Sequence, residues 1–153
     1  MFSIFKRKKT EFFLPEEKEK ILSAIKTAEQ KTSGEVRVFV ESRCRFVDAI
    51  DRAYEIFYGL KMEATELRNG VLVYVALKDK QLAIFADEGI YNKAGAQFWN
   101  NEVKTMLSHF NKENYADGIA QVVQETGEVL NAHFPYDAAT DKNELPDDIV
   151  FGK

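Results

Sequence analysis

The middle of the sequence reads Gly70-Val71-Leu72-Val73-Tyr74-Val75-Ala76-Leu77, a run without any charged side chain. An apolar run of this length is typical of a central β-strand that is covered on both faces. A polar link of three residues, Lys78-Asp79-Lys80, separates this run from a second one over residues 81–86. Because so short a link fits a hairpin, we expect the two strands to be antiparallel.

A third strand is predicted upstream, where residues 36–40 are rich in β-branched and aromatic side chains. About 30 residues separate it from the central strand, and they include a helical pattern that ends near Gly59. A connection that carries a helix is the kind that joins parallel strands. The sheet is therefore expected to contain both parallel and antiparallel pairs.

Three further segments show the spacing of amphipathic helices. One begins at Pro15 and ends before Gly34, and the other two follow the hairpin, over about residues 99–110 and 115–130. Together with the strands, they predict an α/β fold, a three-layer α/β/α sandwich whose mixed central sheet is flanked by amphipathic helices. At 153 residues the chain has the size of a single domain.

The two ends of the chain differ in charge from this central part. We expect a basic N-terminal arm over residues 1–11, the α/β domain over residues 12–135, and an acidic tail over residues 136–153 that packs on the domain. The arm lacks the apolar core that an export signal requires. No run in the sequence approaches the ~20 apolar residues that span a bilayer. The sequence therefore predicts a cytoplasmic protein with at most weak membrane-surface contact through the arm.

Charge, cysteine content and missing motifs exclude several function classes. The net charge of −4 argues against nucleic acid as a partner, because phosphate groups would be repelled. Cys44 is the only cysteine, so neither an internal disulfide nor a cysteine-based zinc site can form. The glycine-rich motifs of nucleotide sites are absent. No catalytic residue can be named, since His109 and His133 fit structural roles at helix ends.

Polar side chains gather at one predicted edge of the sheet. The strand directions place the start of the strand over residues 36–40 and the start of the central strand beside the end of the strand over residues 81–86. Glu35, Asn69, Asp87 and Glu88 should therefore converge, with Gly89 allowing a sharp turn after the last strand. Carboxylate and amide oxygens are the ligands that Ca²⁺ and Mg²⁺ prefer. The pattern predicts a divalent-cation site, with a plain acidic turn as the alternative.

Two arginines are candidates for anion binding, because a guanidinium group binds phosphate or carboxylate through paired hydrogen bonds. Arg68 directly precedes the predicted cation ligands, and Arg45 lies near the start of the second helix. Either could hold a phosphate group beside a bound cation. The alternative around Arg45 is a local salt-bridge network of both charges, formed by Arg43, Arg45, Asp48, Asp51 and Arg52.

Several motifs together resemble those of a known family. They are Thr32-Ser33-Gly34-Glu35-Val36-Arg37-Val38, Asp51-Arg52-Ala53, Arg68-Asn69-Gly70-Val71-Leu72-Val73-Tyr74-Val75-Ala76, Asp87-Glu88-Gly89-Ile90, Phe98-Trp99, His133-Phe134-Pro135 and Asn143-Glu144-Leu145-Pro146-Asp147. In order and spacing they resemble the TPM-domain family over nearly the whole chain after residue 12. The resemblance implies an α/β/α sandwich with a mixed sheet, and the binding of divalent cations, especially calcium.

Three functions are consistent with the residues and the resemblance. The first is a cation-binding accessory or regulatory module with an unknown protein partner. The second is a metal-dependent, phosphatase-like hydrolase, because a plant thylakoid member of the family is described as an acid phosphatase linked to photosystem repair. The third is an adaptor with weak membrane-surface contact. No activated nucleophile is evident near the acidic residues, so binding ranks ahead of catalysis.

Overall fold

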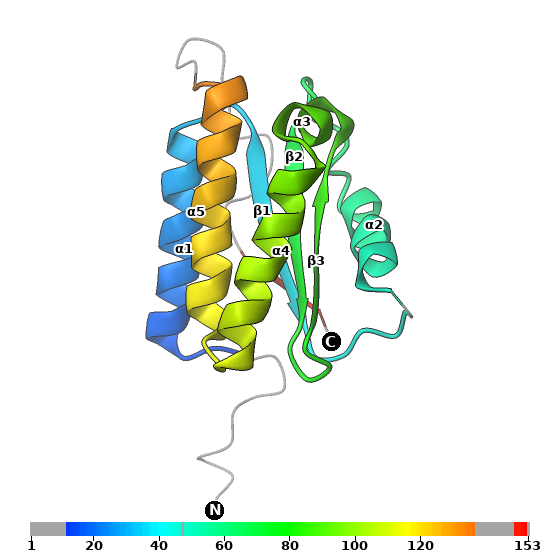
Figure 1. Cartoon of the computed structure of the whole chain (residues 1–153), viewed down its shortest axis with the longest axis vertical. Helices are drawn as coiled ribbons and strands as arrows, with labels where there is room; N and C mark the ends of the chain where they lie inside the picture. The colour runs from blue at the N-terminus through cyan, green and yellow to red at the C-terminus, as the bar shows by residue number, and fades with distance from the viewer. Residues whose placement is uncertain (1–11, 47, 137–148, 153) are drawn as a thin grey trace, which may run out of the picture.

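The computed structural model describes residues 12–46, 48–136 and 149–152, which form one sheet with helices on both faces (Figure 1). In chain order the elements are α1 (Pro15–Gln30), β1 (Glu35–Glu41), α2 (Ala49–Gly59), β2 (Gly70–Ala76), β3 (Gln81–Ala86), α3 (Glu88–Ala94), α4 (Ala96–Asn111), α5 (Tyr115–His133) and β4 (Ile149–Phe151). Within these ranges, no helix combines the length and the apolar composition that crossing a membrane requires. The predicted basic arm, residues 1–11, lies outside the described residues.

The four strands are ordered β3-β2-β1-β4. β1 is parallel to both β2 and β4, whereas β2 and β3 form an antiparallel hairpin. This arrangement confirms the predicted mixed sheet, and the connection between β1 and β2 carries α2 as expected. The hairpin turn spans residues 77–80, one residue more than predicted, because β2 ends at Ala76.

Alternating side chains along the strands assign each helix to one face of the sheet. Val71, Val73 and Val75 share one core with apolar residues of α1, α4 and α5. Leu72 and Tyr74 belong to the other core, which they share with α2. All of β2 is buried, as expected for a strand that is covered on both faces. The predicted three-layer sandwich is therefore confirmed (Figure 1).

Local chemistry explains where α1 begins and why α5 packs closely against it. Pro15 occupies the first turn, where its missing N–H costs nothing, and Glu17 Oε1 accepts a hydrogen bond of 2.7 Å from the Leu14 N–H.

Gly127 of α5 faces Ala28 of α1 so closely that an added Cβ would lie 2.5 Å from the Ala28 Cβ. Glycine thus allows the two helices to approach each other.

Two short elements are not indicated by the sequence pattern. β4 has three residues, too few for an alternating pattern to be recognised, and it extends the sheet beside β1. α3 has seven residues and begins where we expected a sharp turn after Asp87. Part of the predicted acidic tail, residues 137–148 and residue 153, lies outside the described residues.

Candidate functional site

The structure brings the predicted polar segments together at the edge where β1 and β2 begin. Glu35 pairs in register with Gly70, and its N–H donates a hydrogen bond of 3.3 Å to the Asn69 carbonyl. The Asp87 N–H donates a hydrogen bond of 2.9 Å to the Gly70 carbonyl. The predicted convergence of the three chain segments is therefore confirmed for the backbone.

Gly89 has a different role from the one we expected. It lies in the first turn of α3, next to the loop that leads into β2, and its N–H donates a hydrogen bond of 2.7 Å to the Arg68 carbonyl. A Cβ at this position would lie 2.2 Å from the Leu67 carbonyl oxygen and 2.4 Å from that of Arg68. Glycine is thus required by the close approach of two backbones, which fixes the start of α3 against the loop.

Asp87 is buried, with 2% of its surface exposed, and its carboxylate has three hydrogen-bond donors. Arg68 Nε donates to Oδ2 over 2.8 Å, and Arg68 Nη2 donates to Oδ1 over 3.0 Å. Oδ1 also accepts a hydrogen bond of 2.7 Å from the Glu88 N–H, which makes Asp87 the N-cap of α3. Arg68 and the helix terminus thus compensate the buried charge together.

Arg68 also connects the buried carboxylate to an exposed one. Its Nη2 lies 3.4 Å from Oε1 of Glu88, whose side chain is 74% exposed. The hydrogen bonds to Asp87 raise the pKa of Arg68 above its ordinary value, so the guanidinium stays charged. The guanidinium of Arg68 therefore supplies a positive charge to both carboxylates at this edge of the sheet.

A divalent cation does not fit this arrangement as it stands. Among the described residues, no group of three or more histidine, cysteine, aspartate or glutamate side chains is placed to hold a metal ion. The Asp87 carboxylate is occupied by Arg68, whereas Glu35 and Asn69, which are 3% and 1% exposed, lie at the same edge. A cation could use Asp87 only if the guanidinium moved away.

The loop before β2 contributes one candidate ligand that sequence reasoning missed. Two of its polar atoms, Glu63 Oε2 and Asn69 Nδ2, are buried and have no hydrogen-bond partner among the described residues. A buried carboxylate oxygen of this kind is costly unless a proton, water or cation satisfies it. The sequence places Glu63 in a polar connection, which gives no sign that one of its carboxylate oxygens is buried.

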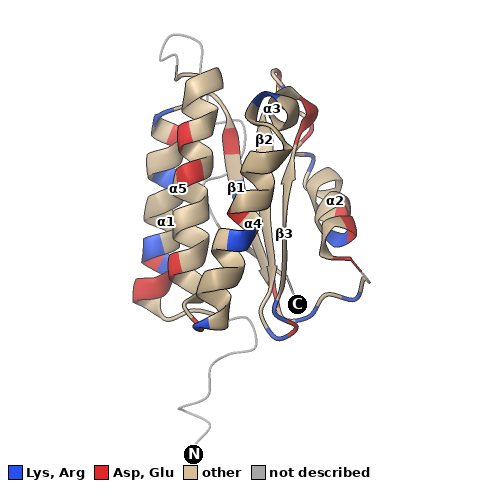
Figure 2. Cartoon of the chain, viewed as in Figure 1, with Lys and Arg blue, Asp and Glu red and all other residues tan. Residues whose placement is uncertain are grey.

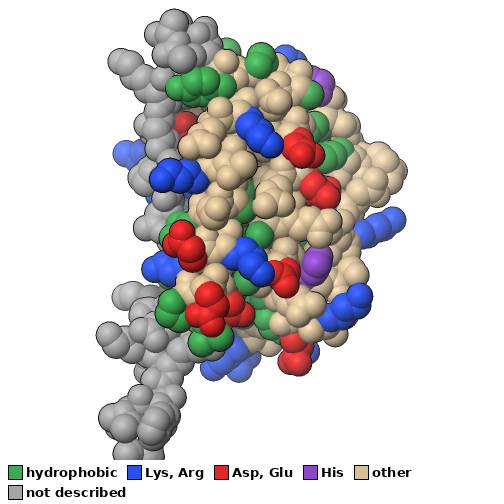
Figure 3. Space-filling model, turned by 90° about the vertical axis from the view of Figure 1, so that its left-hand side faces the viewer, with side chains coloured by type: hydrophobic (Ala, Val, Ile, Leu, Met, Phe, Trp, Pro, Cys, Tyr) green, Lys and Arg blue, Asp and Glu red, His purple; other side chains and the backbone are tan. Residues whose placement is uncertain are grey.

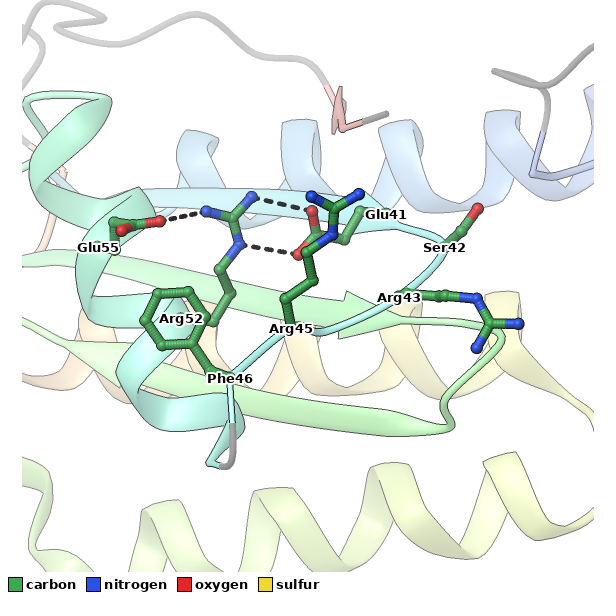
Figure 4. Close-up of a pocket in the computed structure, with 7 residues that line it drawn as sticks. All are labelled: Glu41, Ser42, Arg43, Arg45, Phe46, Arg52 and Glu55. Atoms are coloured by element: carbon green, nitrogen blue, oxygen red, sulfur yellow. Dashed lines mark hydrogen bonds and ion pairs between the residues drawn. The ribbon is translucent and has the colours of Figure 1, made fainter.

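The second predicted anion-binding residue, Arg45, lies at the opposite end of the sheet. It follows β1 and lines a pocket together with residues of the same loop and of α2 (Figure 4); the lining is Glu41, Ser42, Arg43, Arg45, Phe46, Arg52 and Glu55. Arg68 and Arg45 therefore do not belong to one site, because β1 separates the two ends.

Ion pairs join several of the residues that line this pocket. Arg52 donates from Nε and Nη2 to the two carboxylate oxygens of Glu41, each over 2.9 Å, and it also pairs with Glu55 (Figure 4). Arg43 pairs with Asp79 over 3.2 Å. Arg43 and Arg52 thus form ion pairs, but with Asp79, Glu41 and Glu55 and not with the predicted Asp48 and Asp51, and Arg45 is not a member of these pairs among the described residues.

Glu41 is the buried centre of this network, with 5% of its surface exposed. The Tyr74 hydroxyl donates a hydrogen bond to it from the neighbouring strand. Burial and this hydrogen bond raise the pKa of Tyr74, which keeps the phenol protonated as a donor. Arg45 is exposed and, unlike Arg43 and Arg52, forms no ion pair with another described residue.

Another buried carboxyl group, on α4, forms no ion pair with an arginine of the described part of the chain. Glu102 is 5% exposed, and burial, followed by contact with Glu125, raises its pKa to about 8. Nearby, His109 contacts Gln121 over 2.8 Å, and Gln121 donates to Glu125 over 3.1 Å. His109 lies in the last turn of α4, the helix end at which we expected it.

Comparisons with known proteins agree with this geometry. A family model described as TPM domain matches residues 7–129. The chain is also similar to the BA42 protein from the psychrophilic bacterium Bizionia argentinensis, whose structure was solved by NMR; the identity is 38%, the TM-score is 0.85, and the match covers 95% of this chain and 99% of that one. No curated protein matches the chain. By sequence and by structure, the chain belongs to the TPM-domain family.

Proposed function

We propose that this TPM domain is a divalent-cation-binding accessory module, in which Ca²⁺ or Mg²⁺ competes with the guanidinium of Arg68 for Asp87 and Glu88. The observation that carries the proposal is the contact of a single arginine with both carboxylates. Two adjacent carboxylates that share one monovalent cation retain a net negative charge. Hard divalent cations favour such oxygens.

Arg68 is placed so that it can leave without unfolding the site. It comes from a loop, its side chain is 36% exposed, and its backbone has a left-handed φ of 52°. When the guanidinium moves into water, Asp87 still caps α3 through the Glu88 N–H. The release of Arg68 therefore frees one face of the Asp87 carboxylate and leaves the fold intact.

The remaining ligands would come from side chains at the same edge. Asn69 offers an amide oxygen, and Glu35 and Glu63 offer carboxylates on β1 and on the loop. The buried Oε2 of Glu63 supports the proposal, because a cation nearby would offset its desolvation. Water molecules would complete the coordination shell of either ion.

The test is a titration of the full chain with Ca²⁺ or Mg²⁺, followed by amide NMR shifts. We expect shifts at residues 35, 63, 69 and 87–89, and tighter binding by Arg68→Ala because the competing cation is gone. Arg45→Ala at the other end of the sheet is the matched control and should bind as the native chain does. Asp87→Asn, which keeps a capping oxygen, should weaken binding.

Two outcomes would contradict the proposal. The first is the absence of shifts with either ion at millimolar concentration. The second is an affinity that Arg68→Ala leaves unchanged or lowers, since a purely structural arginine does not compete with the ion.

A further inference from the structure

β3 forms an edge of the sheet, and half of its backbone polar groups point away from β2. The Asp87 N–H bonds to the Gly70 carbonyl, and hydrogen-bonded pairs alternate along an antiparallel ladder. Residues 81, 83 and 85 therefore bond to β2, whereas Leu82, Ile84 and Ala86 direct their N–H and C=O groups outward. No described strand pairs with this outer side.

The outer side of β3 forms the floor of an apolar groove between α2 and α4. The groove is lined by Ile50 at the start of α2, by residues 82–86, and by Tyr91, Trp99 and Val103 on the other wall. Figure 1 shows β3 between these two helices. By contrast, the face formed by α1 and α5 carries scattered acidic and basic side chains (Figure 3). The groove thus differs from the α1 and α5 face in the apolar character of its lining.

β3 lacks the features that normally keep an edge strand from pairing. The sequence of residues 81–86 contains no charged residue and no proline, and its register with β2 runs without a bulge. Natural sheets usually protect such edges with lysine, proline, bulges or very short strands. β4, the other edge, has only three residues. β3 is therefore the edge that is suited to accept another strand.

We propose that the strand which pairs with β3 is β3 of a second copy of this chain. A two-fold axis at Ile84 makes the two strands antiparallel and places the outward groups of Leu82, Ile84 and Ala86 opposite one another. The sequence matches itself in this register. A large side chain lies opposite a small one at two positions, because Leu82 lies opposite Ala86 of the other copy and Ala83 lies opposite Phe85.

The charges at the two ends of β3 match in the same register. Lys80 lies in the turn before the strand and Glu88 is the first residue of α3 after it, so the axis brings the lysine end of each β3 to the glutamate end of the other, twice over the contact. Both side chains are exposed in the single chain. The like-charged alternative, in which the strands run parallel, would place lysine beside lysine. Charge complementarity therefore selects the antiparallel pairing.

The helices beside β3 supply additional apolar surface for this contact. The axis places α2 beside α2 and α4 beside α4 of the other copy. Ile50 and Tyr54 on α2 are 46% and 54% exposed, and Tyr91 before α4 is 41% exposed. Tyr54 contacts Phe85 of β3 edge to face, with ring centroids 5.6 Å apart. The paired strands would exchange about six backbone hydrogen bonds and form one continuous eight-stranded sheet from two four-stranded ones.

The test measures the mass of the full chain by sedimentation equilibrium over a range of concentrations, with a chelator present so that cation binding plays no part. We expect a reversible dimer. Lys80→Glu should weaken it at least about tenfold, because it turns two attractive contacts into repulsive ones. Glu88→Lys should do the same, and the double reversal should restore the dimer. Lys78→Glu, an equal charge change in the same turn, should leave it unchanged.

Amide hydrogen exchange supplies a second readout. Protection of Ile84 and Ala86 should rise with protein concentration in the native chain and should not rise in Lys80→Glu. A chain that stays monomeric at millimolar concentration overturns the proposal, as does a dimer that neither single reversal weakens. Protection of β3 that depends on an added extended peptide, in a monomeric chain, would assign the groove to a different occupant.

Discussion

Each end of the sheet holds a buried carboxylate that is paired with an arginine, but the surroundings of the two pairs differ. Arg68 donates two hydrogen bonds to Asp87 where β2 begins, and Arg52 donates two to Glu41 where β1 ends. Basic residues also gather around the second end, in the loop after β1 and in the β2–β3 turn (Figure 2). Arg68 belongs to a loop, whereas Arg52 belongs to a helix, and Glu41 has the Tyr74 hydroxyl as a further donor.

This difference separates a structural ion pair from one that can exchange its cation. At the Glu41 end, the arginine belongs to a helix and is less exposed than Arg68, so it has less freedom to move into water. At the Asp87 end, the helix-capping hydrogen bond remains when the arginine moves into water. We therefore expect changes at the Glu41 end to alter stability, and changes at the Asp87 end to alter the response to ions.

Glu41→Gln should cause the largest loss of stability. It removes the negative charge that compensates Arg52 and leaves a buried ion pair broken, which typically costs about 3 kcal/mol or more. Glu55→Gln is the matched control, because Glu55 pairs with the same arginine at an exposed position and should cost less than about 1 kcal/mol. Urea unfolding measures both. Equal losses for the two variants would show that the buried pair has no special role.

Calcium should stabilise the native chain through the Asp87 end. At a concentration 100 times the dissociation constant, binding to the folded state adds about 2.7 kcal/mol, or roughly 5–10 °C in melting temperature for a domain near this size. Asp87→Asn combined with Glu88→Gln should remove most of this rise, whereas Glu41→Gln should keep it. A rise that survives in the double variant would place the ion elsewhere.

Gly89→Ala tests whether the backbone contact fixes the Asp87 end. The added methyl group would overlap the Leu67 and Arg68 carbonyls, so we expect a loss of about 2 kcal/mol in the free energy of unfolding. Gly59→Ala, where an added Cβ meets no atom within 4 Å, should leave stability unchanged or raise it by up to about 1 kcal/mol. Thermal melts of the two alanine variants make the comparison directly.

Glu102 shows what happens to a buried carboxyl group that forms no ion pair with an arginine among the described residues. Its folded pKa, about 8, lies above its ordinary value of 4.5, so the folded state keeps a proton that the unfolded state has lost between these values. Stability should therefore fall as pH rises from about 4.5 to 8. Glu102→Gln should reduce this fall by up to about 5 kcal/mol, since each pKa unit corresponds to about 1.4 kcal/mol, and urea unfolding at pH 4, 6 and 8 measures the change. Parallel pH profiles for the two proteins would contradict the prediction.

The sequence predicts the long elements because their patterns are local. The apolar run of β2 and the spacing of the major helices are visible in single windows, and the length of the β1–β2 connection fixes strand direction. Strand direction in turn fixes which ends meet, so the convergence of Glu35, Asn69 and Asp87 could be predicted. Short elements such as α3 and β4 offer too few residues for a period to be recognised.

The partners of the buried carboxylates could not be predicted, because they depend on side-chain directions at the ends of elements. Arg68 and Asp87 are 19 positions apart, and Arg68 has a left-handed backbone that the sequence does not indicate. Glu41 is the last residue of β1, and the sequence does not show whether its side chain points to α2 or to solvent. Arg68 could be named as a candidate and Arg52 as a member of a local salt-bridge network, but only the fold shows which carboxylate each one contacts.

The pairing of Arg68 with Asp87 and Glu88 has a consequence for ion selectivity under the proposed function. An incoming ion must interact more strongly with these carboxylates than the guanidinium of Arg68 does. Because Arg68 is part of the chain, its effective concentration at the site is fixed and does not depend on the composition of the medium. Abundant monovalent ions such as Na⁺ and K⁺, with a single charge, gain little by displacing it. The domain would thus respond above a set threshold of divalent ion and ignore the monovalent background.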